Sequence, residues 1–279
     1  MEIDIVNCFC TQQANSGNPA AIVRHFTTNS NEKQKLAKDL GLPVTVFLSE
    51  RNHDHCHVEF FYPQIEMPLC LHGTIGAAYI VLKDEKINNL ILIARNENKL
   101  QIRREGNVIQ VCVSQQSIPA TILNKNLLTK MLNIKSIDEF DHQLPLAISS
   151  VGSAKVLVPL KSFESLASLK PNFDLIAEWS RENGINGLYV YTKCFKDGDF
   201  DFYARGFNPK TGHNEDAATG VAAAALALPL KRSIVVCQGQ FIQRPSEINV
   251  SYDNPDNIWV GGKVHEKISS NESKNTIQK

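Results

Sequence analysis

The chain has 279 residues, a length that predicts two domains or one large one. Because 43% of the residues are hydrophobic and 21% are charged, the chain can bury a sizeable core. Lysines and arginines balance aspartates and glutamates, 29 against 29, which argues against a general binder of nucleic acid or anionic membranes. The longest uncharged apolar run, residues 220–230, is much shorter than the ~20 residues of a membrane span. Seven cysteines without CxxC spacing, and no secretory signal, predict a cytoplasmic protein with reduced thiols.

Short predicted strands alternate with a few predicted helices along the first half of the chain. The opening strand would place Ile3, Ile5, Asn7 and Phe9 on one face, because side chains alternate with period two. A helix is expected over 31–40, with Ser30 or Asn31 as its cap. Further elements of this half are strands over 45–48 and 57–62, a helix over 74–83, and strands over 90–94, 99–103 and 107–113.

A polar segment over 114–142, with one short helix at 127–132, marks the expected domain crossing. The pattern then restarts with strands over 145–149, 155–158, 187–192, 200–207, 233–237, 248–251 and 258–264, and helices over 172–183 and 219–228. The last residues, 269–279, form a polar tail.

The two halves of the chain contain a repeated sequence pattern. The sequence TIGAA opens a helix at Thr74, and TGVAAAA opens another at Thr219, 145 residues later. Small residues on all sides suit a helix enclosed by a sheet, so we predict two similar α/β domains. The boundaries are 1–116 and 117–264, and the C-terminal strand and tail, 265–279, can return to the first domain. Two helix N-termini facing one cleft would attract a carboxylate or an enolate.

The loops before these two helices hold the candidate catalytic groups. Cys70 and His72 precede the first helix, and Glu215 and Asp216 precede the second. An acidic residue there is also explained by the helix dipole, and this is the favoured interpretation for Glu215. For Asp216 the alternative of proton transfer is equally open, while Cys70 is either a proton-transfer group or a small buried hydrophobe. His72 is either catalytic or a loop histidine bonded to backbone.

Cofactor and metal motifs are weak. The histidines at positions 53, 55 and 57 share one face of a strand and could hold a metal, but an exposed strand end is the favoured interpretation. No P-loop or GxGxxG pattern is present, so no nucleotide cofactor is expected.

Four segments in order carry a resemblance to a known family. They are NCFCT with SGNPAAIV at 7–23, FYP with EMPLCLHGT at 61–74, RGFNP with GHNEDAATGVA at 205–222, and QG, RPS and GG between 238 and 262. Together they resemble the phenazine-biosynthesis PhzF-like isomerase family, which has the diaminopimelate-epimerase fold. The resemblance covers nearly the whole chain.

The resemblance implies a fold, an activity and a site. The fold is α/β, with two pseudo-symmetric domains, each a curved, mostly antiparallel sheet or barrel around a central helix. The implied activity is cofactor-independent proton transfer at carbon on a small carboxylate-bearing metabolite, by a homodimer with no nucleic-acid or membrane partner and no metal. The implied catalytic residues are Asp216, His72 and Cys70, and the implied substrate-binding residues are Ser16, Gly17, Asn18, Gly73, Thr74, Thr219, Gly220 and Val221.

Three positions depart from the family pattern. Val44 stands where the family has a proton-shuttling glutamate, Val221 replaces a serine, and Leu71 replaces a glycine. A valine side chain can neither transfer a proton nor donate a hydrogen bond. The alternative to an enzyme is therefore a catalytically impaired member that binds a small ligand.

Overall fold

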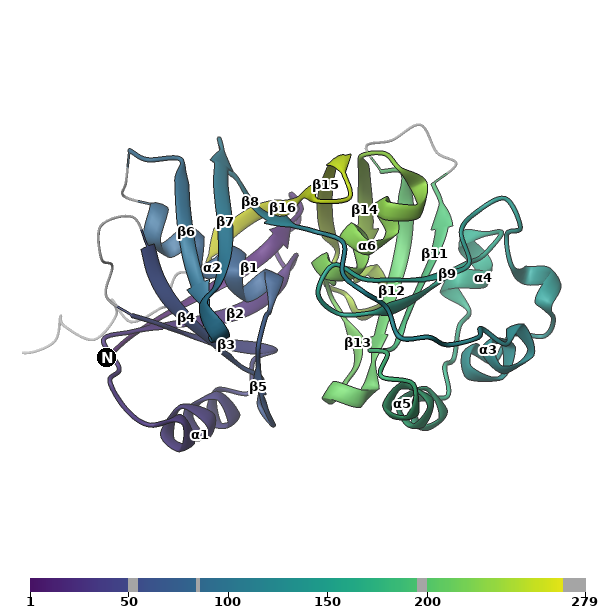
Figure 1. The fold of residues 1–279 in the computed structure, drawn as a ribbon, viewed down its shortest axis with the longest axis horizontal. Helices are drawn as coiled ribbons and strands as arrows, with labels where there is room; N and C mark the ends of the chain where they lie inside the picture. The colour runs from purple at the N-terminus through teal and green to yellow at the C-terminus, as the bar shows by residue number, and fades with distance from the viewer. Residues whose placement is uncertain (50–54, 84–85, 195–199, 268–279) are drawn as a thin grey trace, which may run out of the picture.

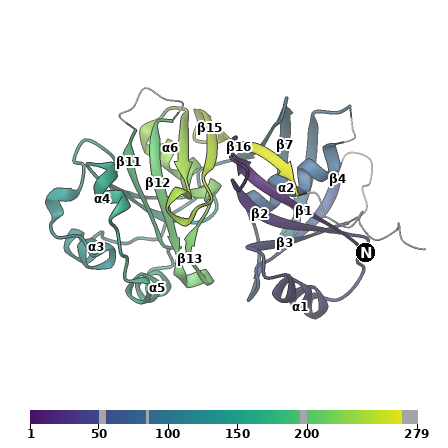
Figure 2. The same cartoon turned by 180° about the vertical axis from the view of Figure 1, so that it is seen from behind.

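The computed structural model describes residues 1–49, 55–83, 86–194 and 200–267. Two lobes lie side by side, and each surrounds one central helix with a curved sheet (Figure 1, and from behind in Figure 2). This is the expected α/β arrangement of two similar halves. No helix in the described part of the chain is long and apolar enough to cross a membrane.

One hydrogen-bonded path of strands runs through both lobes. Its order is β1-β2-β3-β4-β6-β7-β8-β16-β15-β14-β12-β11-β10-β9, and β1 also pairs with β16, which closes the first lobe into a ring. The strands of the first lobe are β1 (Glu2–Cys10), β2 (Asn18–Arg24), β3 (Val44–Leu48), β4 (His55–Phe61), β5 (Glu66–Met67), β6 (Asn89–Ala94), β7 (Asn98–Glu105), β8 (Val108–Val113) and β16 (Asn257–Glu266).

The second lobe has the strands β9 (Ala147–Ser149), β10 (Lys155–Pro159), β11 (Leu188–Lys193), β12 (Phe202–Asn208), β13 (His213–Asp216), β14 (Ile234–Gln238) and β15 (Ser246–Asn254). The helices of the chain are α1 (Ser30–Leu40), α2 (Leu71–Leu82), α3 (Lys125–Leu132), α4 (Phe163–Ala167), α5 (Phe173–Glu182) and α6 (Gly220–Leu230). Because β16 pairs with both β8 and β1, the end of the described chain returns to the first lobe. The boundary between residues 116 and 117 remains a prediction.

The two central helices are small-residue helices enclosed by the sheets. A Cβ added at Gly76 of α2 would lie 2.8 Å from a methyl of Val6 on β1, so only glycine allows this approach. In α6, the four alanines 222–225 are all fully buried. Small side chains thus let each helix axis lie close to its sheet, which places both helix N-termini deep in the molecule.

The opening strand differs from the expected alternation. Val6 and Cys8 face the core, and Phe9 follows them inward because its φ is +63° and the pairing register with β16 shifts between Cys8 and Cys10. Ile3 is 36% exposed. Of the four residues predicted to share a face, Phe9 alone leaves it, because a local bulge reverses the alternation there.

Several element boundaries also differ from those expected. α2 begins at Leu71, three residues before Thr74, and the cap of α1 is Asn29, whose side chain accepts from the amides of Asn31 and Glu32. Helix α4 was not predicted, since its five residues are too few to show a helical period.

A test of the close packing uses Gly261 on β16. A Cβ there would lie 2.0 Å from the carbonyl oxygen of Ile109 on β8, so Gly261→Ala is expected to lower the free energy of unfolding by about 3 kcal/mol. The control is Gly106→Ala, where φ is +59° and no atom lies within 4 Å, and about 1 kcal/mol is expected. Urea denaturation measures both values. Equal losses would contradict the steric account.

Candidate active site

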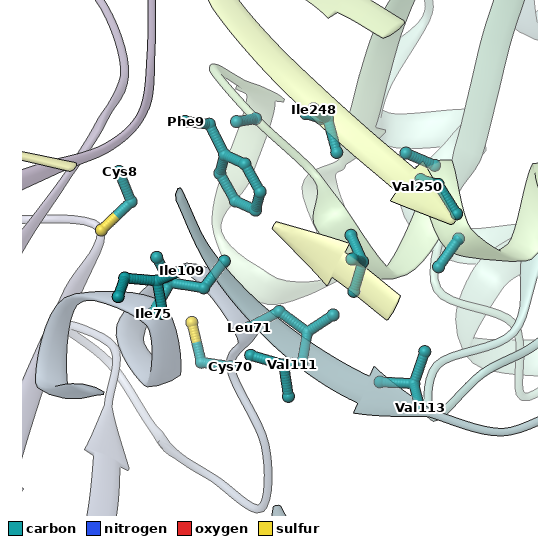
Figure 3. Close-up of a cluster of buried hydrophobic side chains, with 14 of the residues drawn as sticks. Cys8, Phe9, Cys70, Leu71, Ile75, Ile109, Val111, Val113, Ile248 and Val250 are labelled. Carbon is teal, nitrogen blue, oxygen red and sulfur yellow. The ribbon is translucent and has the colours of Figure 1, made fainter. Parts of the chain in front are cut away.

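A cavity of about 690 Å³ opens between the two lobes, at the N-terminal ends of α2 and α6. A Cβ added at Gly220 would lie 2.9 Å from Phe9 Cζ and 3.5 Å from Leu71 Cβ, so the two helix starts adjoin. Figure 3 shows Phe9 with its ring between Cys8 of the first lobe and Ile248 of the second. The cavity is lined from both lobes, by Tyr62, Cys70, Leu71, His72, Lys155, Asn186, Asn208, Lys210, Asp216, Thr219, Gly220 and Val221 among others.

Asp216 is held by one residue from each lobe. The side-chain amide of Asn18 on β2 donates to Asp216 Oδ1 at 2.7 Å, and the hydroxyl of Thr219 donates to Asp216 Oδ2 at 2.9 Å. Asn18 also donates to the carbonyl of Ala218 at 3.1 Å. Both carboxylate oxygens are therefore oriented, and the group lines the cleft.

Gln238, at the end of β14, fixes the segment between Asp216 and α6. Its amide nitrogen donates to the backbone carbonyl of Asp216 at 2.8 Å and to Thr219 Oγ1 at 3.0 Å, and its carbonyl oxygen accepts from the Thr219 amide at 3.1 Å. The short connection from β13 into the helix is thereby rigid, and Asp216 has a defined place beside the helix N-terminus.

Cys70 is the N-cap residue of α2 and lines the cavity from the first lobe. Its Sγ lies 3.3 Å from His72 Nδ1 and accepts from the Tyr62 hydroxyl at 3.7 Å. Burial raises the pKa of the thiol to about 12, although the Gly73 amide and Tyr62 partly oppose this and the charge of Asp216 adds to it. At neutral pH the thiol is therefore protonated. It can donate a proton, but it is not a resting base.

The free amides at the start of α2 lie earlier than expected, because the helix begins at Leu71 and not at Thr74. The Thr74 amide donates to the Cys70 carbonyl at 2.8 Å, and so does the Thr74 hydroxyl at 2.8 Å. The amides of His72 and Gly73 are directed at the Cys70 sulfur instead. The partial positive charge of this helix end is thus centred on Cys70, one turn earlier than Thr74.

The structure brings together only part of the predicted site. Cys70, His72, Asp216, Thr219, Gly220 and Val221 line the cavity. The other predicted residues, Ser16, Gly17, Asn18, Gly73 and Thr74, are not among its lining residues. Ser16 Oγ bonds to the backbone of Thr11, and the Gly17 carbonyl accepts from Arg244 at 3.1 Å. Asn18 acts on the cleft through Asp216.

Val44, at the position of the family glutamate, is fully buried on β3. Its Cγ1 would lie 3.3 Å from a Cβ at Gly73, so the side chain packs against the first turn of α2 and presents no polar atom there.

Glu215 does not serve the helix N-terminus, and that expectation was wrong. It lies on β13 and forms a two-point ion pair with Arg205 on β12, at 2.9 and 2.7 Å. Both side chains are 9% exposed. Arg205 also donates to the carbonyls of Leu166 and Leu169. The ion pair anchors β13, whose last residue is Asp216.

Sequence reasoning missed two cleft residues, Lys155 and Tyr62. Lys155 is 1% exposed, and burial lowers the pKa of its amine to about 7. A lysine at the start of the apolar segment KVLVP was the available signal. The Tyr62 hydroxyl bonds to Cys70 from the segment FYP, where its role has no local sequence pattern.

The histidine segment gives no metal site in the described residues. His53 lies outside them, and His55 and His57 lie on β4 with their ring centroids 6.2 Å apart. No group of three potential ligands occurs among residues that the structure describes.

The two lobes, each with a central helix, and the cleft between the helix starts define the fold of the protein, and comparison with known proteins identifies its family. The model of the phenazine biosynthesis-like protein family (PhzC-PhzF) matches residues 6–267, and the chain belongs to this family. An uncharacterized isomerase of Clostridium acetobutylicum is 28% identical, over 91% of this chain and 92% of the relative. The trans-2,3-dihydro-3-hydroxyanthranilate isomerase of Pseudomonas chlororaphis is 28% identical, over 82% of this chain and 83% of the relative.

Solved structures confirm the expected fold class. A PhzF-family protein of Bacillus anthracis matches with a TM-score of 0.81 and 23% identity, covering 96% of this chain and all of the other. A hydroxyproline epimerase of Agrobacterium vitis, with bound trans-4-hydroxy-L-proline, matches with a TM-score of 0.59 and 10% identity, covering 95% of this chain and 91% of the other.

The buried ion pair behind the site yields a stability prediction. Glu215→Ala leaves the Arg205 guanidinium buried without its carboxylate, and the free energy of unfolding should fall by about 3–5 kcal/mol. Glu266→Ala, which removes an exposed pair with Lys83, should cost less than about 1 kcal/mol. Urea denaturation compares the two. Similar losses would show that burial of the first pair does not matter.

The protonated thiol yields a labelling prediction. Cys70 is buried and the pKa of its thiol is about 12, so iodoacetamide at pH 7.5 should label it at least ~100-fold more slowly than the half-buried Cys112 and Cys194. Peptide mass spectrometry measures each rate, with urea-unfolded protein as the control in which all seven react. Fast labelling of Cys70 would contradict the protonated, enclosed thiol.

Proposed function

We propose that the protein is an isomerase that moves a proton at carbon on a small carboxylate-bearing metabolite without a cofactor. The observation that carries the proposal is that one cleft is lined by a carboxylate of the second lobe and a thiol of the first. Asp216, oriented by Asn18 and Thr219, is a proton acceptor, and the protonated thiol of Cys70 is a proton donor. The isomerase names of the relatives and the family membership support the same activity.

In this mechanism Asp216 removes a proton from the carbon next to the substrate carboxylate. Negative charge then develops on the carboxylate oxygens, and the helix dipoles at the adjoining N-terminal ends of α2 and α6 stabilise it. Cys70 returns a proton to a second carbon, and His72, in contact with the thiol, orients the substrate.

The proton balance closes within the site. After one turnover Asp216 holds the proton taken from the substrate, and Cys70 is left as a thiolate. Because burial raises the pKa of that thiol to about 12, the thiolate readily takes up the proton that Asp216 gives up, and this restores the resting states.

A second candidate function is ligand binding without turnover. It is favoured by Val44, which is fully buried and offers no proton where the family has a glutamate, and by Val221 in the cleft. The cleft and both helix ends would then serve recognition alone.

The resemblance further predicts a homodimer in the cytoplasm with a biosynthetic role, and these remain part of the proposal.

The decisive test is proton exchange in heavy water. The protein is incubated with trans-2,3-dihydro-3-hydroxyanthranilate and a panel of small amino and hydroxy acids, and deuterium at carbon is measured by NMR. Asp216→Asn should reduce the exchange rate at least ~100-fold, because the amide cannot accept the proton. Asp39→Asn, on the exposed face of α1, is the matched control and should change nothing.

An exchange rate that survives Asp216→Asn would overturn the proton-transfer role. Binding of a panel member with no exchange in the unaltered protein would support the second candidate function instead.

A further inference from the structure

Lys155 occupies an unusual place in the second lobe. Side chains alternate along β10, and Val156 and Val158 pack in the outer cluster beneath α3, α4 and α5, whereas Leu157 packs in the inner cluster around α6. Lys155 therefore shares the inner face with Leu157. It is 1% exposed, yet it lines the cleft near the start of α6.

The lysine is held by two acceptors. Its Nζ donates to the backbone carbonyl of Asn186, before β11, and to the side-chain Oδ1 of Asn208, at the end of β12. An ammonium group carries three N–H bonds, and within the described residues no third acceptor bonds it. The remaining N–H is available to a ligand in the cleft, which Asn186 and Asn208 also line.

The charges around Lys155 are unbalanced. The charged groups that act on it are Asp216 on β13, which favours the ammonium form, and Lys210 after β12, which opposes it. Asp216 already accepts from Asn18 and Thr219. The charged side chains that line the described cleft are thus two lysines against one aspartate, with His72 as a further titratable group.

Keeping an amine in this position has a free-energy cost. Burial lowers the pKa of Lys155 to about 7, so the charged form is disfavoured in the empty cleft. An apolar side chain at this position, the first of the apolar strand β10, would avoid that cost. An anionic ligand group would offset it by pairing with the third N–H.

We propose that Lys155 binds a second anionic group of the substrate, in addition to the carboxylate at the helix ends, so that the substrate is a small dicarboxylate. The assignment rests on the proposed function for the place of the first carboxylate. Neither partner of Lys155 belongs to α2 or α6, so its ammonium group is a binding group additional to those helix ends. A phosphate shares the chemistry of anionic oxygens, and the experiment distinguishes it.

Binding at Lys155 is coupled to proton uptake. In the empty cleft the amine is largely neutral above pH 7, and in the complex the anion holds it charged. As long as both carboxylates are ionised, affinity for a dicarboxylate should therefore be greatest on the acid side of pH 7 and fall as the pH rises above it. The affinity falls with rising pH because the pKa of the Lys155 amine is low in the free protein and higher in the complex.

The experiment compares glutarate with its monoamide, glutaramate, by calorimetric titration of the full chain. At pH 6.5 glutarate should bind at least ~10-fold more tightly, and Lys155→Met should remove this preference by weakening glutarate only. Lys155→Arg should retain the preference and abolish its decline with pH, since a guanidinium stays charged. Lys161→Met, an exposed lysine just beyond β10, should behave as the unaltered protein.

The signal of the Lys155 ε-carbon, assigned by its loss in Lys155→Arg, reports the same event directly. Glutarate should raise the pKa of this amine by about one unit or more, and neutral glutaramide should not. No preference for glutarate in the unaltered protein, or a preference that survives Lys155→Met in a protein that still unfolds cooperatively, would overturn the proposal. Inorganic phosphate acting more strongly than glutarate would also overturn it, in favour of a phosphate ester.

These measurements require no turnover. A protein that shows the glutarate preference but no proton exchange with any acid refutes the proposed function and leaves two anion positions. A protein that exchanges protons but shows no preference refutes the role of Lys155 alone.

Discussion

The hydrogen bond from Asn18 to Asp216 joins the two lobes at the point where chemistry is proposed. The donor lies at the start of β2 in the first lobe, and the acceptor lies at the end of β13 in the second, 198 residues later. Its 2.7 Å length fixes one carboxylate oxygen, while Thr219 fixes the other. The orientation of the proposed base therefore depends on how the two lobes are held together.

That arrangement requires small residues at the junction. Gly220 lets α6 begin against Phe9 and Leu71, and the bulge of β1 turns Phe9 inward to meet it. β16 continues the sheet from β15 back to β1 and β8, so backbone pairing as well as side-chain packing connects the lobes. A cleft formed between two lobes joined in this way can present an aspartate and a thiol from different lobes to one small ligand.

Much of this organisation could be predicted from the sequence. The TIGAA and TGVAAAA segments predict the central helices, and the preceding loops predict Cys70, His72 and Asp216 as cleft residues, because a helix start repeated at a fixed offset implies a repeated fold. Local pattern could not show the bulge that turns Phe9 inward, since strand alternation assumes a regular pleat. Nor could it assign Glu215 to Arg205, a pair that exists only once β12 and β13 are adjacent.

Lys155 shows the same limit in the cleft. The strand that holds Lys155 could be predicted from the sequence. The face on which Lys155 lies is known only once Leu157, two residues later, is seen to pack in the inner cluster. The hydrogen-bond partners of Lys155 lie next to two other strands, at the start of β11 and the end of β12. A sequence pattern reports the period of one element, whereas a cleft collects residues from several elements.

The most direct test of the account concerns Asn18, which orients Asp216 but does not line the cavity. Steady-state kinetics of proton exchange are measured for Asn18→Ala, with urea unfolding to verify that the protein remains folded. The account predicts a fall in kcat of at least ~10-fold with KM nearly unchanged, because the base loses its orientation while the binding surface is intact. An unchanged kcat, or a loss confined to KM, would contradict the claim that the contact between the lobes positions the base.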